Sequence, residues 1–131
     1  MKTIKTYHDL EVYQRAYRLA LEIHKVTITF PSIEKYEIGS QIRRASKSAP
    51  TNIAEGFGRK NFAKEYVRFL GIAKASIDEM QVHLEFCYDL GYLIKERYQY
   101  FRSEYEIVGK QLSALINVWL KFKKPNNLTS P

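Results

Sequence analysis

The residues of this chain that could take part in catalysis or bind a metal are few and scattered. The three histidines, His8, His24 and His83, have no cysteine, aspartate or second histidine at the spacing that metal ligands require. Glu79 and His83 lie one helical turn apart, but a single pair does not make a ligand set. The Gly-Phe-Gly at 56–58 follows a helix, so it is a turn and not a phosphate-binding loop. The sequence therefore predicts no enzyme activity, no metal and no cofactor.

Asn52 and Glu55 lie close to the expected end of a helix. A carboxylate is unfavourable there, because the negative end of the helix dipole repels it. We therefore expect a cation or an N–H donor beside Glu55. A hydrogen-bond network that fixes this helix to its neighbours explains both residues better than catalysis does.

Positive charge is concentrated in the middle of the chain. The 131 residues carry a net charge of +7. Residues 43–74 contain eight cations and two acids, whereas residues 75–120 contain four cations and seven acids. Clustering of this kind is typical of proteins that bind nucleic acid. The candidate nucleic-acid-binding residues are Arg43, Arg44, Lys47, Arg59, Lys60, Lys64 and Arg68.

Four helices are predicted to position these cations, over about 9–27, 33–57, 61–91 and 95–122. The third and fourth keep a 4-3 spacing of apolar residues, and the first carries two adjacent apolar stripes. Short connections favour an all-α, antiparallel up-down-up-down four-helix bundle. Because one core does not require both stripes of the first helix, we expect self-association.

The second helix is predicted to bend at Pro50 without breaking. Proline removes a backbone hydrogen bond, but the apolar phase is kept from Ile42 to Ile53. Either Gly56 or Gly58 is expected to end this helix in a left-handed conformation.

Helical phase places Arg43, Arg44 and Lys47 on the outer face of the second helix. Lys64 and Arg68 fall on the outer face of the third, so a ribbon of cations is expected along this hairpin. Such a ribbon neutralises phosphates without reading bases. The alternative is a protein–protein adaptor or scaffold, in which the same cations form salt bridges between subunits. Exposed tyrosines are open to two interpretations, base stacking or burial in a subunit interface.

The chain is predicted to be a single domain, with the bundle at 1–124 and a flexible C-terminal tail at 125–131. The single cysteine, Cys87, excludes an internal disulfide and favours a reducing compartment. Neither an apolar N-terminal segment nor a run long enough to cross a membrane is present. We therefore expect a cytoplasmic protein that does not bind membranes.

A family resemblance rests on an ordered set of residues. The segment 41–45 reads Gln-Ile-Arg-Arg-Ala, and 52–56 reads Asn-Ile-Ala-Glu-Gly. With the proline between them, these segments resemble the signature of bacterial four-helix bundle proteins first noticed as products of intervening sequences in 23S ribosomal RNA genes. The segment 73–79 resembles the third helix of that family, with alanine at 75 where glycine is common. The structural motif comprises Gln41, Pro50, Asn52, Glu55 and Gly56.

The resemblance covers about residues 7–122 and implies further properties. Relatives look like homopentamers, and one branch serves as an accessory to reverse transcriptases of diversity-generating retroelements. The expected function is a non-enzymatic oligomeric bundle that binds RNA or DNA electrostatically or organises a ribonucleoprotein. The expected partners are further copies of the chain, nucleic acid and, if the gene lies in a retroelement, a reverse transcriptase.

Overall fold

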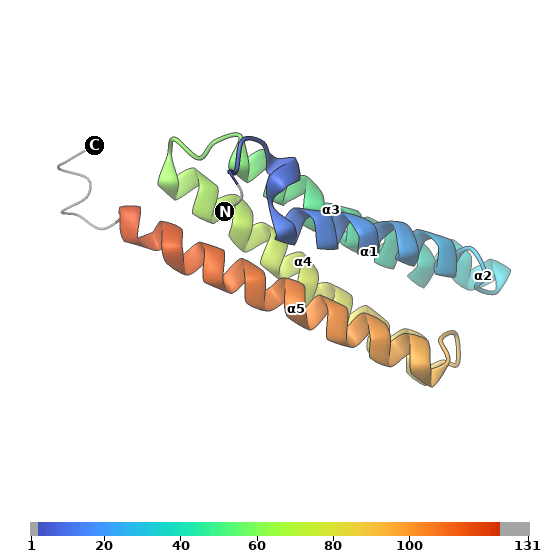
Figure 1. Cartoon of the computed structure of the whole chain (residues 1–131). Coiled ribbons are helices and arrows are strands. Elements are labelled where there is room, and N and C mark those ends of the chain that lie inside the picture. The colour runs from blue at the N-terminus through green and yellow to red at the C-terminus, as the bar shows by residue number, and fades with distance from the viewer. Residues whose placement is uncertain (1–2, 124–131) are drawn as a thin grey trace.

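The computed structural model describes residues 3–123, and every secondary-structure element in that range is helical. The prediction of an all-α chain is confirmed, and the predicted tail at 125–131 lies outside the described residues. Figure 1 shows the axes of the long helices roughly aligned with one another, with α1 beside α3 and α4 beside α5. The long helices are α1 (Glu11–Thr27), α3 (Ile38–Phe57), α4 (Ala63–Asp89) and α5 (Lys95–Leu120). Three short helical segments flank them, namely η1 (Tyr7–Asp9), α2 (Ser32–Lys35) and η2 (Lys121–Lys123).

The core forms where the apolar stripes of the long helices meet. In α4, every position of the predicted 4-3 series from Tyr66 to Cys87 is buried, which confirms its phase. The α3–α4 contact is the most extensive in the chain, and α1 meets α5 over a much smaller area. None of the described helices combines the length and the apolar character that crossing a membrane requires.

The predicted second helix is interrupted at one place and continuous at another. The chain turns at Tyr36 and Glu37, so the expected helix over 33–57 is divided into α2 and α3. Beyond that turn, α3 runs through Pro50 without a break, as predicted. The proline itself is buried.

Neither glycine near the end of α3 forms a left-handed turn, and Gly56 serves helix packing instead. Gly58 has φ −63°, and Gly91, at the end of α4, is the one described residue with positive φ. The expectation that Gly56 or Gly58 ends this helix in a left-handed conformation is therefore wrong. A Cβ added at Gly56 would lie 2.9 Å from Phe69 Cβ and 3.0 Å from Tyr66 Cδ1. Gly56 is thus required because α3 and α4 approach each other closely at this point.

Two glycine-to-alanine substitutions test this close approach. We expect Gly56→Ala to lower the free energy of unfolding by about 1–3 kcal/mol, because the added methyl overpacks the α3–α4 contact. Gly71→Ala is the matched control, since a Cβ there meets nothing within 4 Å. That change should stabilise α4 by about 0.5–1 kcal/mol through its better helix propensity. Urea unfolding of the two variants measures both effects, and equal stability of the two would refute the packing role.

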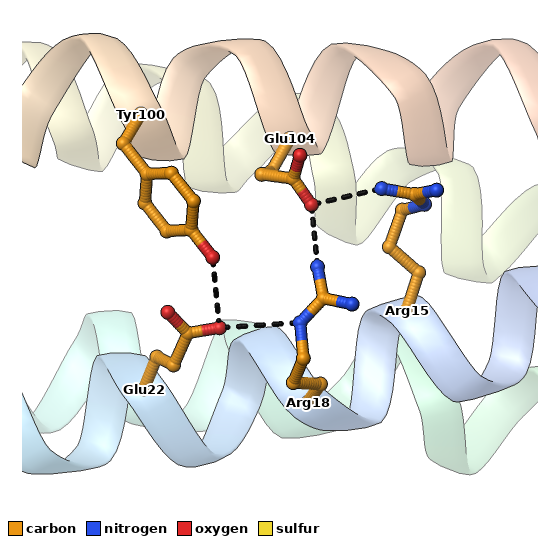
Figure 2. Close-up of polar contacts among 5 residues, drawn as sticks. All are labelled: Arg15, Arg18, Glu22, Tyr100 and Glu104. Carbon is orange, nitrogen blue, oxygen red and sulfur yellow. Dashed lines mark hydrogen bonds and ion pairs between the residues drawn. The ribbon is translucent and has the colours of Figure 1, made fainter.

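A polar cluster joins α1 to α5 where their apolar contact is small. Figure 2 shows Glu104 of α5 accepting hydrogen bonds from Arg15 and Arg18 of α1 through the same carboxylate oxygen. Glu22 accepts from Tyr100 at 3.0 Å and from Arg18 at 3.4 Å. Partial burial and then the bond to Glu22 raise the pKa of Tyr100, so its phenol keeps its proton. The cluster therefore holds α1 against α5 by ionic contacts.

Removal of the shared carboxylate should destabilise the chain. In Glu104→Ala the half-buried guanidinium group of Arg15 loses its acceptor, and the exposed Arg18 keeps only its contact with Glu22. We expect a loss of about 1–3 kcal/mol in the free energy of unfolding. Glu106→Ala is the control on the same helix, since Glu106 forms an exposed pair with Lys110. Its effect should stay within about 0.5 kcal/mol. Chemical unfolding at matched pH measures both, and a neutral Glu104→Ala would show that the cluster is not structural.

Candidate nucleic-acid interface

The turn between α3 and α4 carries a compact group of cations. Backbone hydrogen bonds close this turn, from the N–H of Arg59 to Gly56 O at 2.9 Å and from the N–H of Phe62 to Arg59 O at 2.9 Å. Lys64 and Arg68 follow on the first turns of α4 and are exposed. We call Arg59, Lys60, Lys64 and Arg68 the hairpin-end cluster.

Aromatic rings hold three of these four cations in place. The guanidinium groups of Arg59 and Arg68 lie over the ring of Phe69, at 4.6 and 4.5 Å from its centroid. The ammonium group of Lys60 lies 4.1 Å from the centroid of the Phe57 ring. Such cation–π contacts restrict the long side chains at the surface without neutralising their charge.

Two acids lie beside the hairpin-end cluster, and each is paired with an arginine of the cluster. Glu55 Oε2 lies 3.5 Å from Arg59 Nη1, which also donates to the Glu55 backbone carbonyl, so the expectation of a cation beside Glu55 is confirmed. Glu65 accepts two hydrogen bonds from Arg68 at 3.2 Å, and these bonds lower its pKa. Lys60 and Lys64 have no ion-pair partner within residues 3–123. The cluster therefore keeps a net positive charge.

The fold adds cations from distant parts of the sequence to this end of the molecule. The last turn of α5 lies beside the start of α4, where the rings of Trp119 and Tyr66 are 4.8 Å apart. Lys121, which is exposed, follows directly in η2, and η2 packs on α4. Figure 1 shows the last turn of α5 and the α3–α4 turn at the same end of the molecule. This grouping cannot be read from the sequence, because only the helix packing brings position 121 near position 64.

Arg43 does not lie on an outer surface, and the expectation that it does is wrong. Its Nη1 donates to the buried Thr27 Oγ1 at 3.0 Å, and its Nη2 donates to the Lys35 carbonyl at 2.9 Å. Arg43 therefore ties the end of α1 and the end of α2 to α3. Helical phase distinguishes core from surface but does not show which flank of α3 meets α1.

Lys47 and Arg44 also lie apart from the hairpin-end cluster. Lys47 faces α1, with its Nζ 3.3 Å from His24 Nδ1, and Arg44 is exposed three residues before it. The continuous ribbon expected from the sequence is thus divided into a hairpin-end group and a group beside α1.

An open groove separates α1 from α3 on the side where Lys47 lies. It encloses about 650 Å³, and its lining is mostly apolar. We call it the α1–α3 groove. Its walls are Tyr7 from η1, Tyr13, Tyr17, Ala20, Leu21 and His24 from α1, and Lys47, Pro50, Thr51, Ala54 and Glu55 from α3.

The signature residues of α3 act mainly in helix packing. Asn52 Nδ2 donates to Ser48 O at 2.9 Å and to Ser48 Oγ at 3.1 Å. Ser48 Oγ in turn accepts from Ser76 of α4 at 2.8 Å. The expected network to a neighbouring helix is therefore present for Asn52, whereas Glu55 pairs with Arg59 of the following turn instead. Gln41 is exposed, and its backbone N–H bonds to Glu37 O at 3.2 Å.

The residues that could bind a metal are not gathered into a ligand set. His83 Nε2 lies 2.9 Å from Glu79 Oε2, the helical pair seen in the sequence. Among the described residues no three such side chains lie together as potential ligands. Burial, and then the charge of Glu34, raise the pKa of Cys87 to about 12, so its thiol stays protonated at neutral pH.

Fold and charge distribution together define a small all-helical protein with a basic end. The chain belongs to the family described as 23S rRNA-intervening sequence protein, whose model matches residues 8–114. A crystal structure from Bacteroides thetaiotaomicron, a protein with unknown function from the S23 ribosomal protein family, has a similar fold. Its TM-score is 0.73 at 21% identity, over 81% of this chain and 95% of that chain. No curated protein matches this chain.

Proposed function

We propose that this chain is a non-enzymatic cytoplasmic protein that binds nucleic acid through its hairpin end. In this proposal the four long helices form an antiparallel up-down-up-down bundle that assembles as a homopentamer. The hairpin-end cluster carries the proposal, because it combines four cations within ten residues with two acids that are already paired.

Phosphates are the groups that this surface would contact. Lys60 and Lys64 are available as point charges, and the two arginines present planar donors held by the Phe69 ring. No element of the cluster is shaped to enter a groove and read base edges, so we expect binding with little sequence preference. RNA and DNA are both expected ligands, and organisation of a ribonucleoprotein is the corresponding role.

Assembly would multiply the positive charge. Five copies of a chain with net charge +7 carry a formal +35. Polyanion affinity rises steeply with the number of phosphates neutralised at once. A reverse transcriptase encoded beside the gene would be a protein partner of such an assembly.

The alternative function is a protein–protein adaptor or scaffold. It is favoured by exposed large apolar side chains on α4, of which Val82 is 51% and Phe86 54% exposed. In that case the cations would form salt bridges between chains, and nucleic acid would not bind.

A binding titration at several salt concentrations tests the proposal. Single-stranded RNA should bind the wild-type chain at about 50 mM salt, and its affinity should fall as the salt concentration rises. In a plot of the logarithm of the binding constant against the logarithm of the salt concentration, each phosphate contact should make the slope more negative by roughly 0.7. Lys60→Glu with Lys64→Glu should weaken binding and reduce that slope. Fluorescence anisotropy with a labelled oligonucleotide measures both quantities.

Lys95→Glu with Lys110→Glu is the matched control, because it changes net charge equally at two exposed sites of α5. Its binding should stay closer to wild type. Absence of wild-type binding at low salt would refute the proposal. Equal weakening by the two double variants would show that total charge matters and the hairpin end does not.

A further inference from the structure

Helix α1 presents an apolar stripe that its own chain leaves uncovered. Tyr17 and Leu21, on the wall of the α1–α3 groove, are 49% and 51% exposed, and Ile28 continues the stripe at 51%. Tyr13 precedes them, with its ring stacked on that of Tyr17 at 5.8 Å. Across the groove, α3 contributes the buried Pro50 as a flat apolar floor.

A second uncovered apolar surface lies on α4. Ile72, Val82, Phe86 and Leu90 are all large, apolar and at least 38% exposed. Positions 72, 75, 79, 82, 86 and 90 follow one another in steps of three and four residues. The four apolar side chains therefore share one face of the helix, on which positions 75 and 79 are alanine and glutamate. We call Val82, Phe86 and Leu90, at the C-terminal half of α4, the α4 outer row.

We propose that the α4 outer row of one copy of the chain docks into the α1–α3 groove of a second copy. The proposal rests on the self-association proposed above and specifies its contact. The dimensions agree. The outer row runs over nine residues, from Val82 to Leu90 at the end of α4, and the α3 wall from Lys47 to Glu55 also runs over nine, about 12 Å in each case. An apolar helix face lying in a groove between two helices is a common mode of recognition.

Charges around the two surfaces are complementary. Glu85 and Asp89 each lie three residues after a member of the outer row and are exposed. Glu85 pairs with Arg102 of its own chain at 3.4 Å, so Asp89 is the acid that is available to a second copy. Lys47 lines the groove at its end near α2, and the exposed Lys25 and Arg44 lie close to it in sequence, next to His24 on α1 and three residues before Lys47 on α3. Within residues 3–123, neither Arg44 nor Asp89 has an ion-pair partner.

This charge pattern also fixes the relative orientation of the two copies. Within one chain, the α4–α5 turn lies beside α2, because Tyr92 donates to Glu34 at 2.7 Å. The acidic end of α4 and the basic end of the groove are therefore at the same end of the molecule (Figure 1). Docking that pairs them makes neighbouring copies point the same way. A head-to-tail contact between two different surfaces with one orientation is the type that closes into a cyclic ring.

The test uses one disrupted surface at a time. Leu21→Asp places a charge in the groove, and Phe86→Asp places one in the outer row. Because both positions are about half exposed, each variant should remain folded by circular dichroism. Val118→Asp, at a 50% exposed position on α5, is the control. In size-exclusion chromatography with light scattering, wild type and Val118→Asp should be oligomers, and each of the other two variants alone should be a monomer.

Mixing the two variants gives the decisive result. Leu21→Asp retains an intact outer row and Phe86→Asp retains an intact groove, so an equimolar mixture should form one contact and stop at a dimer of two different chains. A mixture that stays monomeric would overturn the proposal, as would oligomers of either variant alone. Oligomeric Leu21→Asp with lost RNA binding would assign the groove to nucleic acid instead and equally overturn it. A monomeric wild type would contradict self-association itself. That result would not bear on RNA binding by the hairpin-end cluster, which the salt titration measures separately.

Discussion

The close approach of α3 to α4 at Gly56 is the constraint on which the rest of the structure depends. A side chain at this position would collide with Phe69 and Tyr66, so the two helices approach each other closely near the point where the chain reverses. The same approach sets Phe69 beside the turn, where its ring lies under Arg59 and Arg68. The packing of two helices and the placement of surface cations therefore have one cause.

Apolar contacts hold α3 against α4, whereas polar contacts are more important between α1 and α5. The α3–α4 contact is apolar and extensive and is reinforced by the bond between Ser48 and Ser76. The α1–α5 contact is small and depends on Arg15, Arg18 and Glu104 (Figure 2). Some apolar side chains of α1 line the α1–α3 groove, so fewer of them pack against α5. An uncovered apolar stripe and an ionic seam on the same helix are consistent with a chain that completes its packing by association.

The sequence was sufficient for the helices and for the core, but not for the surface. Every position of the 4-3 series in α4 from Tyr66 to Cys87 is buried as predicted, but the series does not include Phe69 and Ser76, which are buried too. Unbroken apolar phase predicted that α3 continues through Pro50. Arg43 was misplaced because phase does not reveal which side of α3 lies against α1. Lys121 was missed because its proximity to the α3–α4 turn is a tertiary fact. The turn at Glu37 was missed because the stretch before it has ordinary helical composition.

We propose that nucleic acid contacts the end of the molecule where α3 meets α4. Lysine footprinting tests it most directly, because the chain has exposed or half-buried lysines at both ends. Acetylation would be compared by mass spectrometry with and without single-stranded RNA at low salt. We expect protection of Lys60, Lys64 and Lys121, with little change at Lys35, Lys95 and Lys110. Protection of the second group, or equal protection of both, would contradict it.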